Sequence, residues 1–274
     1  MISRATALRA WLFLICISLL VPSLCSCFRL VDHDHIIDSE IMERARNHLQ
    51  QVYPEKDFVI DNAYYVFKDN CYRVKISSPS SRDSYFSLDF DLKTYDLIRD
   101  SYEADVLSGY NTRKRLVEEY CAVVEPALKQ IEGLRLISAD LCCYSEEEAR
   151  GKYFSPQGLK TETLIFDYSY EIKNIGKEYG YIEISFSEES LSVERCLDRL
   201  MEVHIQLAED GGDYFVISIE LEHISSEKER ESFGIYGITK EDLFCEDPLS
   251  RLQEMWTEQE AHRQTLKDKW EQNT

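Results

Sequence analysis

Two aspartates on one predicted strand are the first side chains in the sequence that could do acid–base chemistry. Asp89 and Asp91 are two residues apart, so an extended chain places both carboxylates on the same face. Such a pair could bind calcium, or act as a general acid and a general base. The same spacing also occurs on the wet side of an ordinary sheet, and we favour that interpretation.

A second group of metal-capable side chains lies near the N-terminus. It consists of the consecutive residues Asp32, His33, Asp34 and His35. An extended chain would put the two imidazoles on one side, but a zinc or nickel site needs three or four converging ligands. We interpret this segment as a solvated tether, with a metal site as the alternative.

The cysteines permit disulfide bonds but do not require them. Six cysteines follow Cys27, and an even number in an exported chain permits three disulfides. Cys121 and Cys196 fall in or beside apolar helix faces, which is typical of buried free thiols. Cys142 and Cys143 are adjacent in a predicted strand and point to opposite faces, so they would not readily bond each other. We therefore predict mainly free or structural thiols.

Local motifs of the common enzyme classes are absent from the sequence. It contains no Gly-x-Ser-x-Gly, His-Glu-x-x-His, Walker loop, Gly-x-Gly-x-x-Gly or Cys-x-x-Cys. His204 falls on the apolar stripe of a predicted helix, which favours a structural histidine over a catalytic one. A site assembled from scattered residues would leave no such trace. The absence favours a binding or interaction module over an enzyme, and we predict no cofactor.

The N-terminal segment, residues 1–26, has the three-part layout of a secretory signal. Arg4 and Arg9 precede an apolar run, and the segment contains no acidic residue. The four residues Leu24–Cys27 resemble the bacterial lipobox, whose cysteine receives a diacylglyceryl group before cleavage. The resemblance implies a lipid anchor on Cys27, with an uncleaved transmembrane helix as the alternative. Both interpretations place residue 29 onward on the extracytoplasmic side of the cell membrane.

The charge of the chain narrows the choice of partners. Lysine and arginine number 31 and aspartate and glutamate 51, so the net charge is −20. A nucleic acid would be repelled by such a surface. We expect contact with the membrane through the lipid anchor, and a protein or peptide of the cell envelope as partner. Two alternatives are an envelope hydrolase that uses Asp89 and Asp91, and a binder of cations or cationic peptides.

The predicted elements that position these groups form two lobes. Residues 39–108 read as a helix and three strands, and residues 109–245 as a helix, three strands, a helix and a strand. A tether (residues 27–38) precedes them, and a charged C-terminal helix (residues 246–274) follows, with Pro248 at its first position. The predicted fold class is α+β, with two packed lobes, each an antiparallel sheet covered on one face by helices.

Within the second lobe the expected elements are more specific. The pattern predicts strands at residues 134–142, 163–172, 179–186 and 214–221 and a helix at residues 191–208. The first helix of this lobe begins near residue 111 and contains Pro126, where we expect a kink or a break. From Ser225 onward the chain turns polar and charged.

Two segments resemble known families. A Tyr-x-Val-x-Ile strand (residues 72–76), followed by a strand that ends in Asp-x-x-Thr (residues 91–94), resembles a PepSY-type module. That family usually has a glycine where this chain has Tyr95. Residues 108–120 are similar to a segment of YfjL-like lipoproteins of Gram-positive bacteria. Neither resemblance implies a catalytic residue, and the PepSY resemblance implies extracytoplasmic binding and restraint of peptidases.

Overall fold

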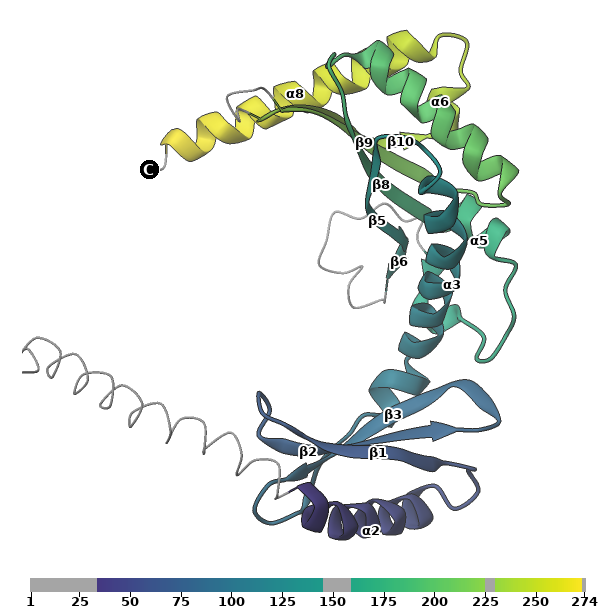
Figure 1. Cartoon of the computed structure of the whole chain (residues 1–274), viewed down its shortest axis with the longest axis vertical. Coiled ribbons are helices and arrows are strands. Elements are labelled where there is room, and N and C mark those ends of the chain that lie inside the picture. Colours follow the sequence, from purple (N-terminus) through teal and green to yellow (C-terminus); the bar gives the residue numbers. More distant parts are fainter. Residues whose placement is uncertain (1–33, 145–158, 225–229, 273–274) are drawn as a thin grey trace, which may run out of the picture. The chain divides into compact units, whose positions relative to one another are not determined.

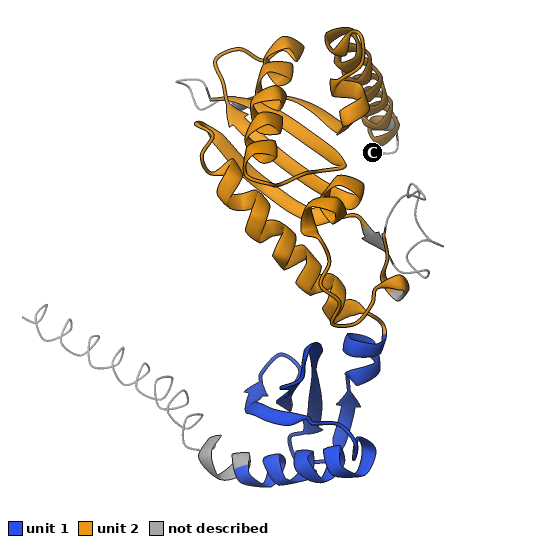
Figure 2. Ribbon diagram, turned by 90° about the vertical axis from the view of Figure 1, so that its right-hand side faces the viewer, with its two compact units in different colours: residues 1–107 blue, residues 108–274 orange. Residues whose placement is uncertain are grey.

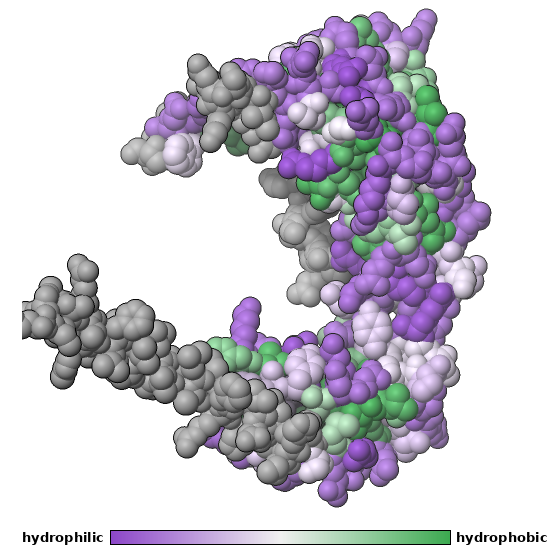
Figure 3. Space-filling view, in the orientation of Figure 1, coloured by the Kyte–Doolittle hydropathy of each residue, from purple (hydrophilic) through white to green (hydrophobic). Residues whose placement is uncertain are grey.

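The computed structural model describes residues 34–144, 159–224 and 230–272. It divides into two compact units, residues 1–107 and 108–274 (Figure 2). Helices and sheets in both units confirm the predicted α+β class. Within the described ranges, no helix combines the length and the hydropathy that a membrane span requires. Hydrophilic side chains dominate the visible surface of each unit (Figure 3), as the net charge of −20 predicts.

The first unit is one helix packed on a four-stranded antiparallel sheet of order β1-β2-β3-β4 (Figure 1). Its elements are α2 (Asp34–Val52), β1 (Val59–Val66), β2 (Cys71–Ser78), β3 (Ser81–Asp91), β4 (Leu97–Asp100) and a π-helical turn (Glu103–Leu107). Helix α2 buries Ile41, Ala45 and Leu49 against alternate residues of β2 and β3. This alternation is why the sequence predicts a sheet covered on one face.

Two features of the first unit differ from the prediction. Helix α2 begins at Asp34, so residues 34–38 are helical rather than part of a tether. The apolar spacing of four that runs through Ile41 and Ala45 also includes Ile37, which extends the helical pattern toward the N-terminus. The short strand β4 was not predicted, because its four residues are too few for a periodic signal.

The second unit is a four-stranded sheet of order β10-β9-β8-β5 with helices in one shared core. Its main elements are α3 (Tyr110–Leu128), β5 (Leu134–Leu141), α5 (Ile172–Tyr179), β8 (Gly180–Ser187), α6 (Val193–Glu209), β9 (Val216–Ile224), β10 (Arg230–Thr239), α7 (Lys240–Leu243) and α8 (Pro248–Gln272). A small parallel pair, β6 (Cys143–Tyr144) and β7 (Leu159–Lys160), and a 3₁₀ turn (Thr161–Thr163) complete it. Strands β8 and β9 are parallel because α6 connects them as a crossover. The sheet is therefore mixed rather than purely antiparallel.

Three further expectations for the second unit need correction. The strand predicted at residues 163–172 is a turn, because Asp167 adopts a positive φ of 57° and reverses the chain. Strand β10 lies where only polar chain was expected. Pro126 falls in the last turn of α3, where little helix remains for it to interrupt.

The thiol prediction is confirmed for five cysteines of the described chain. Cys71, Cys121, Cys142, Cys196 and Cys245 are free. Cys71 and Cys196 are buried, and burial raises the pKa of both thiols. These two side chains act as small apolar residues in the fold.

Candidate binding groove

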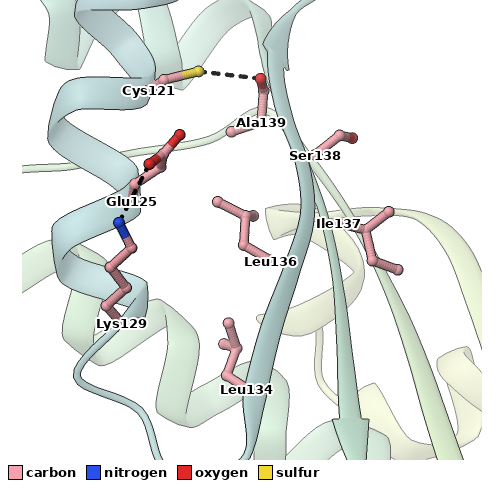
Figure 4. Close-up of a pocket in the computed structure, with 8 residues that line it drawn as sticks. All are labelled: Cys121, Glu125, Lys129, Leu134, Leu136, Ile137, Ser138 and Ala139. Atoms are coloured by element: carbon pink, nitrogen blue, oxygen red, sulfur yellow. Dashed lines mark hydrogen bonds and ion pairs between the residues drawn. The ribbon is translucent and has the colours of Figure 1, made fainter. Parts of the chain in front are cut away.

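Helix α3 forms one wall of a groove in the second unit (Figure 4). One side of the helix is buried in the core of the unit through Leu116, Tyr120, Val124, Ala127 and Leu128. Cys121, Glu125 and Lys129 are spaced by four residues and therefore form a stripe along one side of the helix. This stripe faces β5 across the groove.

Tyr120 fixes the position of α3. Its side chain is buried, and its hydroxyl donates a hydrogen bond to the main-chain oxygen of Asp213 (2.9 Å). The ring packs directly on the backbone of Gly176 and Gly180, where a Cβ atom would come within 2.7 Å and 2.5 Å of Tyr120 atoms. Glycine at these two positions therefore allows the close contact that holds this wall of the groove.

Strand β5 forms the opposite wall. Gly133 has a φ of 76°, which permits the turn that brings the chain from α3 directly into β5. Figure 4 shows Leu134 and Leu136 pointing toward α3, whereas Ile137 points away from it. The pairing of β5 with β8 is irregular between Leu136 and Ser138, so Ile137 occupies a bulge. Ile137 is 43% exposed, which is high for an isoleucine in a strand.

The space between the two walls has a volume of about 330 Å³. Aliphatic side chains line its β5 side, and its α3 side carries the Cys121 thiol and an exposed ion pair between Glu125 and Lys129 (3.5 Å). This volume and lining lie in the range of sites that bind small apolar groups, about 300 to 1,000 Å³. Burial, and next the charge of Glu125, raise the pKa of the Cys121 thiol. The thiol is therefore protonated and is a weak hydrogen-bond donor rather than a nucleophile.

Strand β5 lies at the edge of its sheet, and it pairs only with β8 among the described strands. The carbonyl of Ala139 accepts a hydrogen bond from the Cys121 thiol (3.2 Å), so it points toward α3 rather than toward β8. In an antiparallel ladder the N–H and C=O of one residue point to the same side, so the Ala139 N–H also faces the groove. The Leu141 N–H is bound by the Asp140 carboxylate (2.7 Å). The Cys121 and Asp140 side chains thus bind two main-chain groups of the β5 edge, and these groups could otherwise pair with another strand.

Polar residues of β5 lie on the other face of the sheet. Ser138 pairs with Glu183 of β8, and Arg135 pairs with Ser185. Arg135 donates hydrogen bonds to Glu222 (2.6 Å) and to the Ser185 hydroxyl (2.9 Å). The face of β5 toward α3 is therefore apolar, and its opposite face carries Ser138 and Arg135 beside the polar residues of β8.

The two aspartates singled out by the sequence have separate partners. Asp89 is buried and accepts two hydrogen bonds from Arg73 (2.7 and 2.9 Å). One oxygen of Asp91 accepts the N–H groups of Lys93 (2.8 Å) and Thr94 (2.9 Å), and these hydrogen bonds lower its pKa. One carboxylate thus neutralises a cation and the other holds a turn. This arrangement gives no support to the carboxylate-pair hydrolase.

The remaining sequence candidates are placed only in part. Cys27, Asp32 and His33 lie outside the described residues, and Asp34 and His35 form the start of α2, whose side chains are not described there. Among the described residues, no group of three or more His, Cys, Asp or Glu side chains could hold a metal ion.

His204 is half-buried, as its place on the helix stripe predicts. Its ring lies edge-on to Phe244 (4.7 Å) and its Nδ1 is 3.4 Å from the Tyr214 hydroxyl. Burial, and next the charge of Lys240, lower the pKa of His204. The ring is therefore packed as a neutral side chain.

The groove itself was not predicted. The sequence predicts Cys121 in or beside an apolar helix face and a strand that contains Leu134 and Leu136, but nothing in one sequence shows that this strand lies at an edge. The stripe of Cys121, Glu125 and Lys129 is the one local signal, because it continues beside the buried face of the same helix.

Comparison of the chain with protein-family models, with curated proteins and with solved structures gives no match. The resemblances to PepSY-type modules and YfjL-like lipoproteins stay predictions.

Proposed function

We propose that the protein is a membrane-anchored extracytoplasmic binding module whose second unit binds an extended peptide by strand addition between α3 and β5. In strand addition, main-chain hydrogen bonds to a sheet edge supply affinity, and pockets for alternate side chains supply specificity. The observation that carries the proposal is the apolar pocket directly beside the outward-facing main chain of Ala139.

The state of the edge supports this mode of binding. The Cys121 thiol holds the Ala139 carbonyl by a weak hydrogen bond, and a peptide N–H is a stronger donor to the same atom. An incoming strand can therefore replace the thiol as the donor to Ala139 once the Cys121 side chain moves aside. The bulge at Ile137 twists the edge and exposes an apolar side chain beside it.

The pocket supports a peptide with alternating side chains. Successive residues of a strand point to opposite faces, so every second side chain of an added strand would point toward α3. There it would contact Leu134, Leu136 and the methyl group of Ala139. The partner we expect is therefore a segment with apolar residues at alternate positions.

Filling the pocket tests this proposal. The probe is a fluorescent peptide of about nine residues that alternates leucine and serine, a typical strand length. Cys121→Phe places a ring in the space that the peptide's apolar side chains need, and removes nothing buried in the core. We expect the Kd for the probe, measured by fluorescence anisotropy, to rise by at least about tenfold.

The matched control is Cys245→Phe, which adds the same ring at an exposed cysteine outside the pocket lining. We expect this variant to bind the probe like the unmodified protein. Equal loss of binding in both variants, or unchanged binding in Cys121→Phe, would contradict the location of the site.

The anchor is the other half of the proposal, and it rests on the lipobox resemblance of Leu24–Cys27. Two or three acyl chains would hold the protein at the membrane, at about 0.8 kcal/mol per buried methylene. Intact-mass analysis of protein expressed in a Gram-positive host should show loss of residues 1–26 and added acyl mass. A Cys27→Ala variant should show neither change. Acyl-free protein that retains its N-terminus in both cases would instead support a transmembrane anchor.

A further inference from the structure

The polar side of the groove can distinguish between peptides. Neighbouring strands lie about 4.8 Å apart, so a strand added to β5 would be separated from β8 by one strand only. On the polar face, Ser138 stands between this added strand and Glu183. Because serine is short, a long side chain on the added strand can cross over Ser138 and reach the Glu183 carboxylate.

Glu183 is available for such a contact. Its carboxylate accepts one long hydrogen bond from the Tyr181 hydroxyl (3.4 Å), and no lysine or arginine of the described chain lies within ion-pair distance. The residue is half-buried on the sheet, where a charge interaction is screened less than at an exposed position. A cation placed beside it would meet an unneutralised carboxylate.

The other polar position on β5, Arg135, disfavours a basic side chain on the added strand. Arg135 lies on the same polar face, and its guanidinium already binds Glu222 and Ser185. A basic side chain opposite Arg135 would meet a like charge with its counter-charge already paired. The charge pattern therefore distinguishes two positions along the added strand.

We infer that the groove selects an extended peptide that carries a lysine or arginine directly opposite Ser138, where the cation reaches Glu183. This inference rests on the strand addition proposed above and names the partner class: an alternating apolar peptide with one basic residue on its polar side. The net charge of −20 favours the approach of such a peptide.

A lysine scan tests the inference. Starting from the alternating leucine–serine probe, each serine is replaced in turn by lysine, and the Kd is measured at low salt, about 0.05 M. We expect one position to bind about five- to tenfold more tightly than the all-serine probe. Norleucine at that position, which keeps the aliphatic stem without the charge, should not give this gain.

Glu183→Gln should abolish the gain from lysine, measured as the ratio of the Kd values of the all-serine and lysine probes for the same variant. The matched control is Glu220→Gln, because Glu220 lies on β9, one strand farther from the groove. That variant should keep the gain. Raising the salt concentration on the unmodified protein should shrink the gain as well, which tests the charge interaction without any substitution.

The outcomes separate the two proposals. If the all-serine probe binds and Cys121→Phe blocks it, but lysine gives no gain at any position, the charge selection is wrong and the strand addition stands. A gain that survives Glu183→Gln also overturns the assignment to Glu183. If no peptide of the series binds, the proposed function fails and the charge selection fails with it.

Discussion

Replacing Gly180 by alanine is expected to lower the free energy of unfolding of the second unit by about 3 kcal/mol, the upper part of the usual range for overpacking. The added Cβ would lie 2.5 Å from the carbonyl oxygen of Gly176 and 2.5 Å from the hydroxyl of Tyr120. A backbone atom cannot rotate away, and Tyr120 is buried and hydrogen-bonded to Asp213. Either the backbone between Gly176 and Gly180 or the Tyr120 side chain that holds α3 must therefore shift.

Chemical denaturation followed by tryptophan fluorescence measures this effect. Trp256 stacks on Phe233 (5.1 Å between ring centroids) and therefore reports on the second unit. Gly212→Ala is the matched control, since Gly212 is also buried but its Cβ would first meet the flexible end of Leu207 at 3.1 Å. We expect the control to lose less than about 1 kcal/mol. Equal losses in the two variants would contradict the role given to the Tyr120 contact.

The Gly180→Ala variant also bears on the groove. Tyr120 precedes Cys121 in the same helix, so a displaced Tyr120 moves the α3 wall relative to β5. Peptide affinity should therefore fall together with stability in this variant, whereas Cys121→Phe should reduce affinity alone. The two variants separate loss of the wall from filling of the space.

Much of the fold could be predicted because its strands bury one face each. In β2 the alternation of Tyr72, Val74 and Ile76 with polar residues fixes which side meets the core. Strand β10 could not be found in this way. Its pairing is irregular between Ile235 and Ile238, and Gly237 has a φ of 74°, so the apolar residues lose their spacing of two.

The wrong prediction of a strand at residues 163–172 has a different cause. Its residues are rich in β-branched and aromatic side chains, which favours a strand on composition alone. Asp167 turns the chain, and the Ile165 N–H donates to the Tyr170 hydroxyl (2.7 Å) instead of to a neighbouring strand. A local hydrogen bond thus replaces the ladder that the pattern predicts.

The candidate site was hidden from sequence because it depends on strand order. The pairing of β8 with both β5 and β9 decides which strand lies at an edge. These partners are about 35 to 50 residues apart in sequence, and a crossover helix connects β8 to β9. The two aspartates that the sequence does indicate, Asp89 and Asp91, share a strand but have different partners. Residue spacing predicts on which face of a strand a side chain lies, but it does not predict which group neutralises the charge of that side chain.

N-methylated peptides can show whether the main chain of a bound peptide pairs with β5. Two versions of the leucine–serine probe are made, one methylated on the nitrogens of alternate residues and the other on the remaining nitrogens. In a strand, alternate N–H groups point to the same neighbour, so one version loses the donors that face β5 and the other loses only those that face solvent. Fluorescence anisotropy then gives the Kd of each version.

We expect one methylated probe to lose binding by about a hundredfold or more, and the other to bind like the unmodified peptide. The retained binding should still be blocked by Cys121→Phe, which ties it to the groove between α3 and β5. Equal affinity of the two methylated probes would contradict strand addition, because a peptide held by its side chains alone does not distinguish the two edges of its own backbone.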